Sequence, residues 1–149
     1  MENKRKILVN EGFNMLAEGK SIRIRAHGYS MYPCIRPGSV ILIEPVWIKG
    51  DPVPGEIVAI KRESGLIVHR LKKIVQKNGM DYYIARGDSN AFPDDPVRLH
   101  IIAGRVVSGE WKGKPFNLNK NVRQDYFLNR VRVIWILFMK RISRLLHPN

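Results

Sequence analysis

The stretch His27-Gly-Tyr-Ser-Met-Tyr-Pro33 separates two segments that have the character of β-strands. Before it, Ser21–Arg25 alternates polar and apolar residues with a period of two, which is typical of a half-buried strand. After it, the turn Arg36-Pro-Gly-Ser39 leads into the apolar run Val40–Glu44, which predicts another strand. Ser30 therefore lies where a strand gives way to a tight bend. A serine in such a place is either a displayed nucleophile or an ordinary turn residue.

Further short segments with strand character follow, separated by glycine and proline. The predicted strands are Glu56–Arg62, Leu66–Val75, Tyr82–Arg86 and Leu99–Ser108, and the predicted loops are Trp47–Gly55 and Gly87–Pro96. Many short strands with this punctuation predict a mainly β protein with one compact, coiled, antiparallel sheet. A chain of 149 residues suits a single domain of this kind.

Two helices are predicted to flank the sheet. The segment Glu2–Gly19 is typical of a short amphipathic helix and not of a signal peptide, because polar residues interrupt its first apolar run after three residues. The segment Gln124–Leu146 is typical of one longer helix. We expect residues 1–20 to form the N-terminal helix, 21–113 the β domain, and 114–149 a linker followed by a basic amphipathic C-terminal helix.

The charge of the chain indicates a polyanionic partner. The sequence holds 26 Lys and Arg against 13 Asp and Glu, a net charge of +13. From Lys120 onward, seven basic residues face the single acidic residue Asp125. The apolar centre of this segment, Val133–Met139, is too short to cross a bilayer. We therefore expect residues 124–146 to lie on an anionic membrane surface, with the protein cytoplasmic and peripheral. The alternative is that this helix packs on its own domain or on a second copy, so an oligomer stays possible.

A second stretch, Leu66-Ile-Val-His-Arg-Leu71, adds a histidine in a predicted strand. Five blocks occur in order: Ser-Met-x-Pro, Pro-Gly-Ser-Val, Gly-Glu-Ile-Val-Ala-Ile, Ile-Val-His-Arg, and Arg-Gly-Asp-Ser-Asn followed by Asp-Asp. Over about 24–107 the chain resembles the superfamily of type I signal peptidases and LexA-like serine peptidases. It is most similar to the branch of the endoplasmic reticulum, archaea and some bacilli, in which histidine replaces a lysine base. The resemblance implies a signal peptidase-type β fold and a serine endopeptidase that removes a leader or signal peptide from a precursor, bound as an extended strand along a sheet edge.

The resemblance implies Ser30 as the nucleophile and His69 as the general base. The residue chemistry agrees, because a serine hydroxyl needs a base to take its proton and a neutral imidazole accepts one near neutral pH. On the predicted strand, His69 shares a face with Ile67, Leu71 and Lys73, whereas Arg70 points the other way.

Three acidic residues of the loop that follows are candidates for the group that orients the histidine. In the histidine-type signal peptidases the third member is the second Asp of the Asp-Asp pair, which is Asp95 here. Because this loop is one residue longer than the family pattern, Asp94 is the alternative. We expect Asp88 to structure the loop through its side chain, although it is also a possible third member.

The remaining parts of the site are less specified by the pattern. The backbone N–H of Ser30 is the natural first donor to an oxyanion, and the second donor is open. Lys61 and Lys73 are alternative bases, each of which would need burial to become neutral. Cys34 is the single cysteine, so it offers neither a disulfide nor metal-ligand spacing, and we expect no metal or other cofactor.

Two other functions compete with this hypothesis. One is a LexA-like regulator that binds DNA and cleaves itself, but only about twenty residues precede the predicted sheet, which is short for a helix-turn-helix domain. The other is a basic β module that binds nucleic acid without catalysis. Nucleic acid is the less expected partner, because the cations gather in the tail and do not alternate with aromatic residues along a strand.

Overall fold

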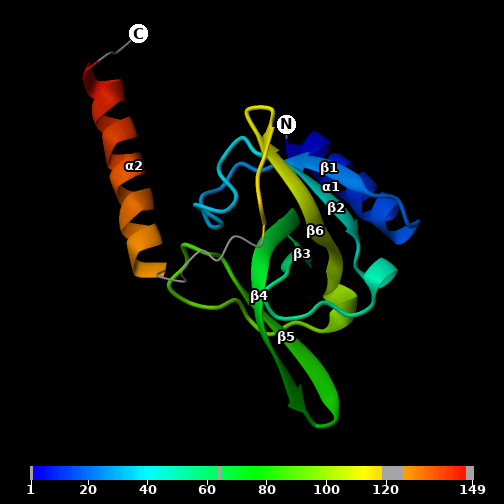
Figure 1. The fold of residues 1–149 in the computed structure, drawn as a ribbon. Helices are drawn as coiled ribbons and strands as arrows, with labels where there is room; N and C mark the ends of the chain where they lie inside the picture. Colours follow the sequence, from blue (N-terminus) through cyan, green and yellow to red (C-terminus); the bar gives the residue numbers. More distant parts are fainter. Residues whose placement is uncertain (1, 64, 119–125, 147–149) are drawn as a thin grey trace.

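The computed structural model describes residues 2–63, 65–118 and 126–146 (Figure 1). Its body is one seven-stranded antiparallel sheet with the strand order β1-β2-β6-β3-β4-β5 and with β7 beside β6. The strands are β1 (Ile22–Arg25), β2 (Val40–Pro45), β3 (Ile57–Arg62), β4 (Gly65–Lys77), β5 (Met80–Arg86), β6 (Ile102–Trp111) and β7 (Lys114–Pro115). The predicted fold class, a mainly β antiparallel sheet with a helix at each end, is confirmed.

The helices occupy opposite sides of the molecule. Helix α1 (Glu2–Ala17) lies beside β1 and β2, whereas α2 (Tyr126–Leu146) stands apart from the sheet on the other side (Figure 1). Two short 3-10 helices, η1 (Val46–Lys49) and η2 (Leu99–Ile101), interrupt the connections between strands. No helix in the described part of the chain is both long and apolar enough to cross a membrane.

Both ends of the last long strand differ from those predicted. Residues Leu99–Ile101 were expected to begin the last long strand, but the Ile101 N–H bonds to the Arg98 carbonyl at 3.0 Å and closes a 3-10 turn. The strand therefore starts at Ile102. At its other end the strand continues to Trp111, three residues past the predicted end at Ser108, and a tight turn then returns the chain as β7. The predicted division of the chain into three segments stays a prediction.

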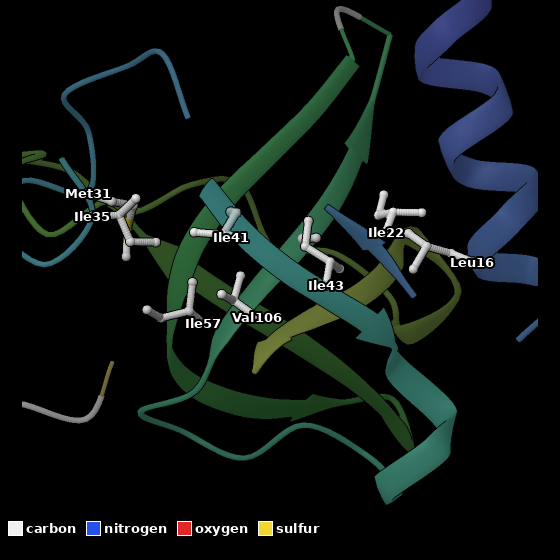
Figure 2. Close-up of a cluster of buried hydrophobic side chains, with 9 residues drawn as sticks. Leu16, Ile22, Met31, Ile35, Ile41, Ile43, Ile57 and Val106 are labelled. Atoms are coloured by element: carbon white, nitrogen blue, oxygen red, sulfur yellow. The ribbon is translucent and has the colours of Figure 1, made fainter. Parts of the chain in front are cut away.

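Strand β3 is buried on both faces, which makes it the centre of the coiled sheet. Ile57 and Ala59 point into one apolar cluster, and Val58 and Ile60 point into another. The first cluster contains Leu16, Ile22, Met31, Ile35, Ile41, Ile43, Ile57, Ala59 and Val106 (Figure 2). The second contains Val46, Val58, Ile60, Leu71, Tyr83, Ala85, Val97 and Ile102. Each large apolar side chain buried here contributes about 1.5–3 kcal/mol to folding.

A β-bulge interrupts the pairing of β4 with β5. Leu71 pairs with Ala85 and Lys73 with Ile84, so Lys72 is an extra residue without a partner on β5. Such a bulge breaks the alternation of side chains along the strand. Before it, the pairing with β5 begins only at Arg70, so the first part of β4 has one unpaired edge.

Candidate active site

Ser30 lies in a loop whose two ends are tied together. Leaving β1, the N–H of Ala26 donates to the carbonyl of Ser39 at 2.8 Å, and the N–H of Gly38 donates back to Ala26 at 2.7 Å. Directly after Ser30, Met31 and Ile35 are 4% and 2% exposed and belong to the apolar core. Met31 is therefore fixed in the apolar core, whereas Ser30 is only half-buried.

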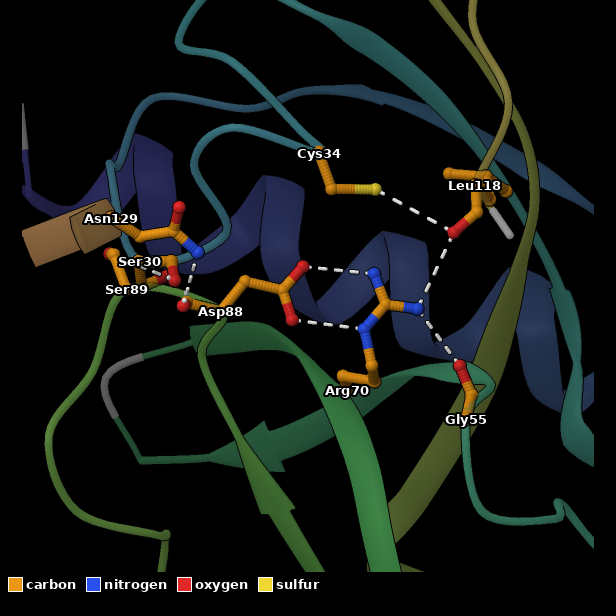
Figure 3. Close-up of polar contacts among 8 residues, drawn as sticks. All are labelled: Ser30, Cys34, Gly55, Arg70, Asp88, Ser89, Leu118 and Asn129. Carbon is orange, nitrogen blue, oxygen red and sulfur yellow. Dashed lines mark hydrogen bonds and ion pairs between the residues drawn. The ribbon is translucent and has the colours of Figure 1, made fainter. Parts of the chain in front are cut away.

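The turn that follows β5 holds the backbone of Ser30. The N–H of Ser89 donates to the Ser30 carbonyl at 2.9 Å, and the Ser89 hydroxyl lies 2.7 and 3.1 Å from the carbonyl oxygens of Tyr29 and Ser30 (Figure 3). A Cβ on Gly87 would lie 2.7 Å from the Ser30 carbonyl oxygen, so this close approach requires glycine. Among the described residues, neither the hydroxyl nor the backbone N–H of Ser30 makes a hydrogen bond.

His69 lies on β4, opposite Val58 of β3, and is 6% exposed. Its Nδ1 is 2.6 Å from Oδ2 of Asp94, whose side chain is 18% exposed. Asp94 is itself held in place, because its N–H donates to the carbonyl of Ala85 on β5 at 2.8 Å. A carboxylate at Nδ1 favours the tautomer with the proton on that nitrogen, which leaves Nε2 as the proton acceptor.

The carboxylate that meets His69 is thus Asp94 and not Asp95, which the resemblance placed first. Asp95 is exposed, and its carbonyl accepts a hydrogen bond from Arg62 at 3.5 Å. The backbone of Asp94 is held to β5 by its hydrogen bond to Ala85, and the Asp94 carboxylate is the one that contacts the imidazole. The extra residue of this loop is where the chain departs from the pattern on which Asp95 was chosen.

Asp88 contacts a different residue, Arg70 on β4. Its two carboxylate oxygens accept hydrogen bonds from Nε and Nη2 of Arg70 at 2.9 Å each (Figure 3). The pair is buried, with 9% of the Arg70 side chain and 4% of the Asp88 side chain exposed. Arg70 also donates to the carbonyls of Gly55 and Leu118. Asp88 belongs to the turn that binds Ser30, and Arg70 belongs to β4, which carries His69. The ion pair therefore ties this turn to β4.

The two lysines considered as alternative bases lie in exposed positions. The Lys61 ammonium is 5.0 Å from the centre of the Phe13 ring on α1, and Lys73 is exposed on β4.

The loop from Gly87 to Asp94 makes the contacts that bring the site together: it binds the backbone of Ser30 and orients His69. Among the described residues no hydrogen bond joins Ser30 to His69, and catalytic hydrogen bonds often form only when substrate binds.

Helix α2 reaches the same turn. Packing of this helix on its own domain was the alternative to membrane binding, but the sequence did not indicate which part of the domain it contacts. Asn129 is 3% exposed, and its side-chain amide donates to the carbonyl of Asp88 at 3.1 Å (Figure 3). Farther along the helix, the Lys140 ammonium donates to the hydroxyl of Tyr29 at 2.6 Å. A polar Asn in a mainly apolar helix was the only signal in the sequence for this contact. Ser89 and Arg70 were also missed, although each directly follows a candidate residue.

The comparison with known proteins agrees with this geometry. The family model described as Peptidase S24-like matches residues 2–107, which include α1, Ser30, His69 and Asp94. No curated protein matches the chain. This family includes both LexA-like self-cleaving peptidases and signal peptidase-like enzymes. Since the match covers most of the sequence and all of the candidate site apart from α2, the chain belongs to the Peptidase S24-like family of serine peptidases.

Proposed function

We propose that this protein is a serine endopeptidase of signal peptidase-like type that removes a leader or signal peptide from a precursor. The observation that carries the proposal is the 2.6 Å contact between His69 Nδ1 and Asp94 Oδ2, made by the loop that also binds the backbone of Ser30. A buried imidazole oriented by a carboxylate, from the same loop that holds the backbone of a serine with an unbonded hydroxyl, is suited to acyl transfer.

In this mechanism the Ser30 hydroxyl oxygen attacks the carbonyl carbon of the scissile peptide bond, and His69 Nε2 takes the hydroxyl proton. Asp94 stabilises the imidazolium that forms. The unbonded N–H of Ser30 donates to the developing oxyanion. His69 then gives its proton to the leaving amine, which releases the first product and leaves an acyl ester on Ser30. A water molecule, deprotonated by His69, attacks this ester and frees the serine.

The substrate is proposed to bind as an extended strand beside β4. Residues Leu66–Val68 precede the point at which β5 begins to pair, so their outer edge is open, and they lead directly to His69. Main-chain hydrogen bonds along such an edge hold a peptide in extended form and bring one bond to the serine. Shallow contacts with the partly buried side chains of this segment would select small residues before the cleaved bond.

The experiment is cleavage of a mixed peptide library, read by mass spectrometry, by the wild type, Ser30→Ala and His69→Ala. Both variants should lose about a thousandfold or more of the rate. Ser108→Ala and His100→Ala, which change an exposed serine and an exposed histidine, are the matched controls. Cleavage that survives in Ser30→Ala ends the proposal, and cleavage that survives in His69→Ala but not in a lysine variant assigns the base to that lysine.

Self-cleavage is a second candidate, favoured by the family match. It predicts that the purified chain shortens with time and that Ser30→Ala stays intact. A wild type that cuts library peptides in trans while its own mass stays constant rules this candidate out.

We further propose that α2 binds an anionic membrane surface. Large apolar side chains share one face of the helix at helical spacing: Phe127, Val131, Ile134, Trp135 and Phe138 are all exposed. The residues that contact the body, Asn129 and Lys140, lie on the opposite face. Arginines that flank the apolar face place positive charge at the depth of lipid headgroups.

A further inference from the structure

Three cationic side chains gather near the turn that holds Ser30 and share one carboxylate. Arg70 occupies both carboxylate oxygens of Asp88. Arg86 lies opposite Arg70 in the β4–β5 pairing, and Lys72 is the extra residue of the adjacent bulge. Within the described ranges, neither Lys72 nor Arg86 makes an ion pair or a side-chain hydrogen bond. The cluster therefore carries two more positive than negative charges.

Parts of these two cations are removed from water. Nζ of Lys72 and Nε of Arg86 are buried and have no hydrogen-bond partner among the described residues. Burial lowers the pKa of Lys72, and repulsion from Arg86 and Arg70 lowers it further, against the attraction of Asp88. A buried cation is costly unless an anion accepts its hydrogen bonds. The arrangement therefore favours binding of an anion beside Lys72 and Arg86.

We propose that Lys72 and Arg86 form a binding site for a phosphate group, between the β4–β5 bulge and the first turn of α2. A guanidinium presents a planar fork to phosphate oxygens, and an ammonium adds a compact charge, so the pair matches this anion in charge and geometry. The Tyr126 ring, whose centre is 5.3 Å from the Arg86 guanidinium carbon, forms one wall of the site on the side of α2.

The position of the site indicates that the phosphate belongs to a lipid headgroup. The apolar face of α2 points away from the body, so a helix lying in a membrane surface leaves its body-facing side at the depth of the headgroups. Arg86 and Tyr126 lie on that side. The lipid source rests on the membrane association proposed above, whereas phosphate binding itself depends neither on that association nor on peptidase activity.

The test is thermal unfolding of the full chain in sodium chloride and in inorganic phosphate at equal ionic strength. A specific site predicts a saturable rise of the melting temperature with phosphate. Lys72→Met and Arg86→Gln should each raise the apparent phosphate Kd by about tenfold or more, since each removes a charged hydrogen-bond donor. Lys73→Met changes the next residue, which is an exposed lysine of the same charge, and should leave the Kd unchanged.

Three results would overturn the phosphate site. The first is the absence of a saturable effect in the wild type, and the second is an equal loss in Lys73→Met, which would indicate a general charge effect. The third concerns Asp125, the acidic residue just before α2 in the sequence. If Asp125→Asn binds phosphate and the wild type does not, a carboxylate of the chain itself neutralises the cations. Lys72→Met removes an unpaired cation, so it should melt no lower than the wild type without phosphate.

The source of the phosphate is decided with vesicles. Binding to phosphatidylcholine vesicles is compared with binding to vesicles that also contain phosphatidic acid. If Lys72→Met loses more of the phosphatidic acid-dependent binding than Lys73→Met, the ligand is a lipid headgroup. If inorganic phosphate binds but the two variants bind these vesicles equally, the site takes a soluble phosphate and the lipid assignment fails.

Discussion

At the scale of single residues, the loop after β5 decides which carboxylate meets His69. The sequence places three acidic residues in this loop, and only the folded chain separates their tasks. Asp88 is occupied by Arg70, Asp95 is exposed, and Asp94 lies 2.6 Å from the imidazole. The backbone hydrogen bond from Asp94 to Ala85 sets this outcome. Such a bond depends on the path of the loop, which a residue pattern does not specify.

The first prediction separates Asp94 from its neighbour. Asp94→Asn should lower kcat/KM for a library peptide by about a hundredfold or more, because an amide neither stabilises the imidazolium nor selects the productive tautomer. Asp95→Asn makes the same chemical change one residue away and should stay close to the wild type. The measurement is steady-state kinetics of both variants on one cleaved peptide. A large loss in Asp95→Asn, with Asp94→Asn unaffected, would return the role to Asp95.

The bulge at Lys72 is a second feature of this scale that the sequence did not predict. Side chains of a strand alternate between its two faces, and β4 follows this rule up to Leu71. His69 and Arg70 accordingly contact different carboxylates, Asp94 and Asp88. One inserted residue ends that alternation, so the predicted face of His69 and Leu71 does not continue to Lys73. The lysines considered as bases were Lys61 and Lys73, whereas among the described residues Lys72 is the lysine whose Nζ is buried without a hydrogen-bond partner.

At the scale of the elements, α2 combines two opposite faces. Asn129 and Lys140 attach one face to the body near Ser30, and the other face carries exposed aromatic and aliphatic side chains. The sequence predicted the helix, its amphipathic character and its end at Leu146. It did not predict the contact with the Asp88 carbonyl, because that contact depends on a residue 41 positions away in the chain.

The second prediction tests the exposed face of α2. Trp135→Ser should weaken binding to anionic vesicles in a sedimentation assay by about tenfold, because it removes a large apolar side chain from the acyl boundary. Trp47→Ser is the matched control: Trp47 is 59% exposed and Trp135 is 61% exposed, but Trp47 lies on η1, away from the helix. Equal losses in both variants, or concentration-dependent dimers that disappear in Trp135→Ser, would contradict membrane binding by α2.

At the scale of the whole molecule, the Arg70–Asp88 pair connects parts of the chain that the sheet alone does not join. Arg70 on β4 bonds to the turn after β5 through Asp88, to the loop before β3 through the carbonyl of Gly55, and to the segment after β7 through the carbonyl of Leu118. One guanidinium therefore positions several loops around Ser30. This arrangement links the stability of the fold to the geometry of the site.

The third prediction concerns this pair. Asp88→Ala should lower the free energy of unfolding by about 3–5 kcal/mol, because it leaves the buried Arg70 without its carboxylate. Urea unfolding monitored by circular dichroism measures the change. The double variant Arg70→Met, Asp88→Ala should lose less than the sum of the two single changes, since the charges depend on each other.

A surface ion pair serves as the control for that prediction. Arg23 and Glu110 lie 3.0 Å apart, with 63% and 42% of their side chains exposed. Glu110→Ala should therefore change the free energy of unfolding by no more than about 1 kcal/mol. A similar cost for Glu110→Ala and Asp88→Ala would mean that burial does not distinguish the two pairs.

The sequence by itself determined the local features of this protein. Alternation of apolar residues predicted β1 to β5 to within a few residues, and glycine and proline marked the turns between them. The exception at the start of β6 arose because residues 99–101 have the composition of a strand but form a turn through a local hydrogen bond. The order of five motifs along the chain, and the family resemblance that they carry, also singled out Ser30 and His69.

The tertiary structure decided everything that depends on contacts distant in the chain. It selected Asp94 as the partner of His69, joined Asp88 to Arg70, brought α2 to the turn at Ser89, and left Lys72 and Arg86 without a counter-charge among the described residues. The physical reason is that residue type and spacing control the backbone within one element. The meeting of side chains from different elements depends on register, bulges and loop paths, and these result from the packing of the whole chain.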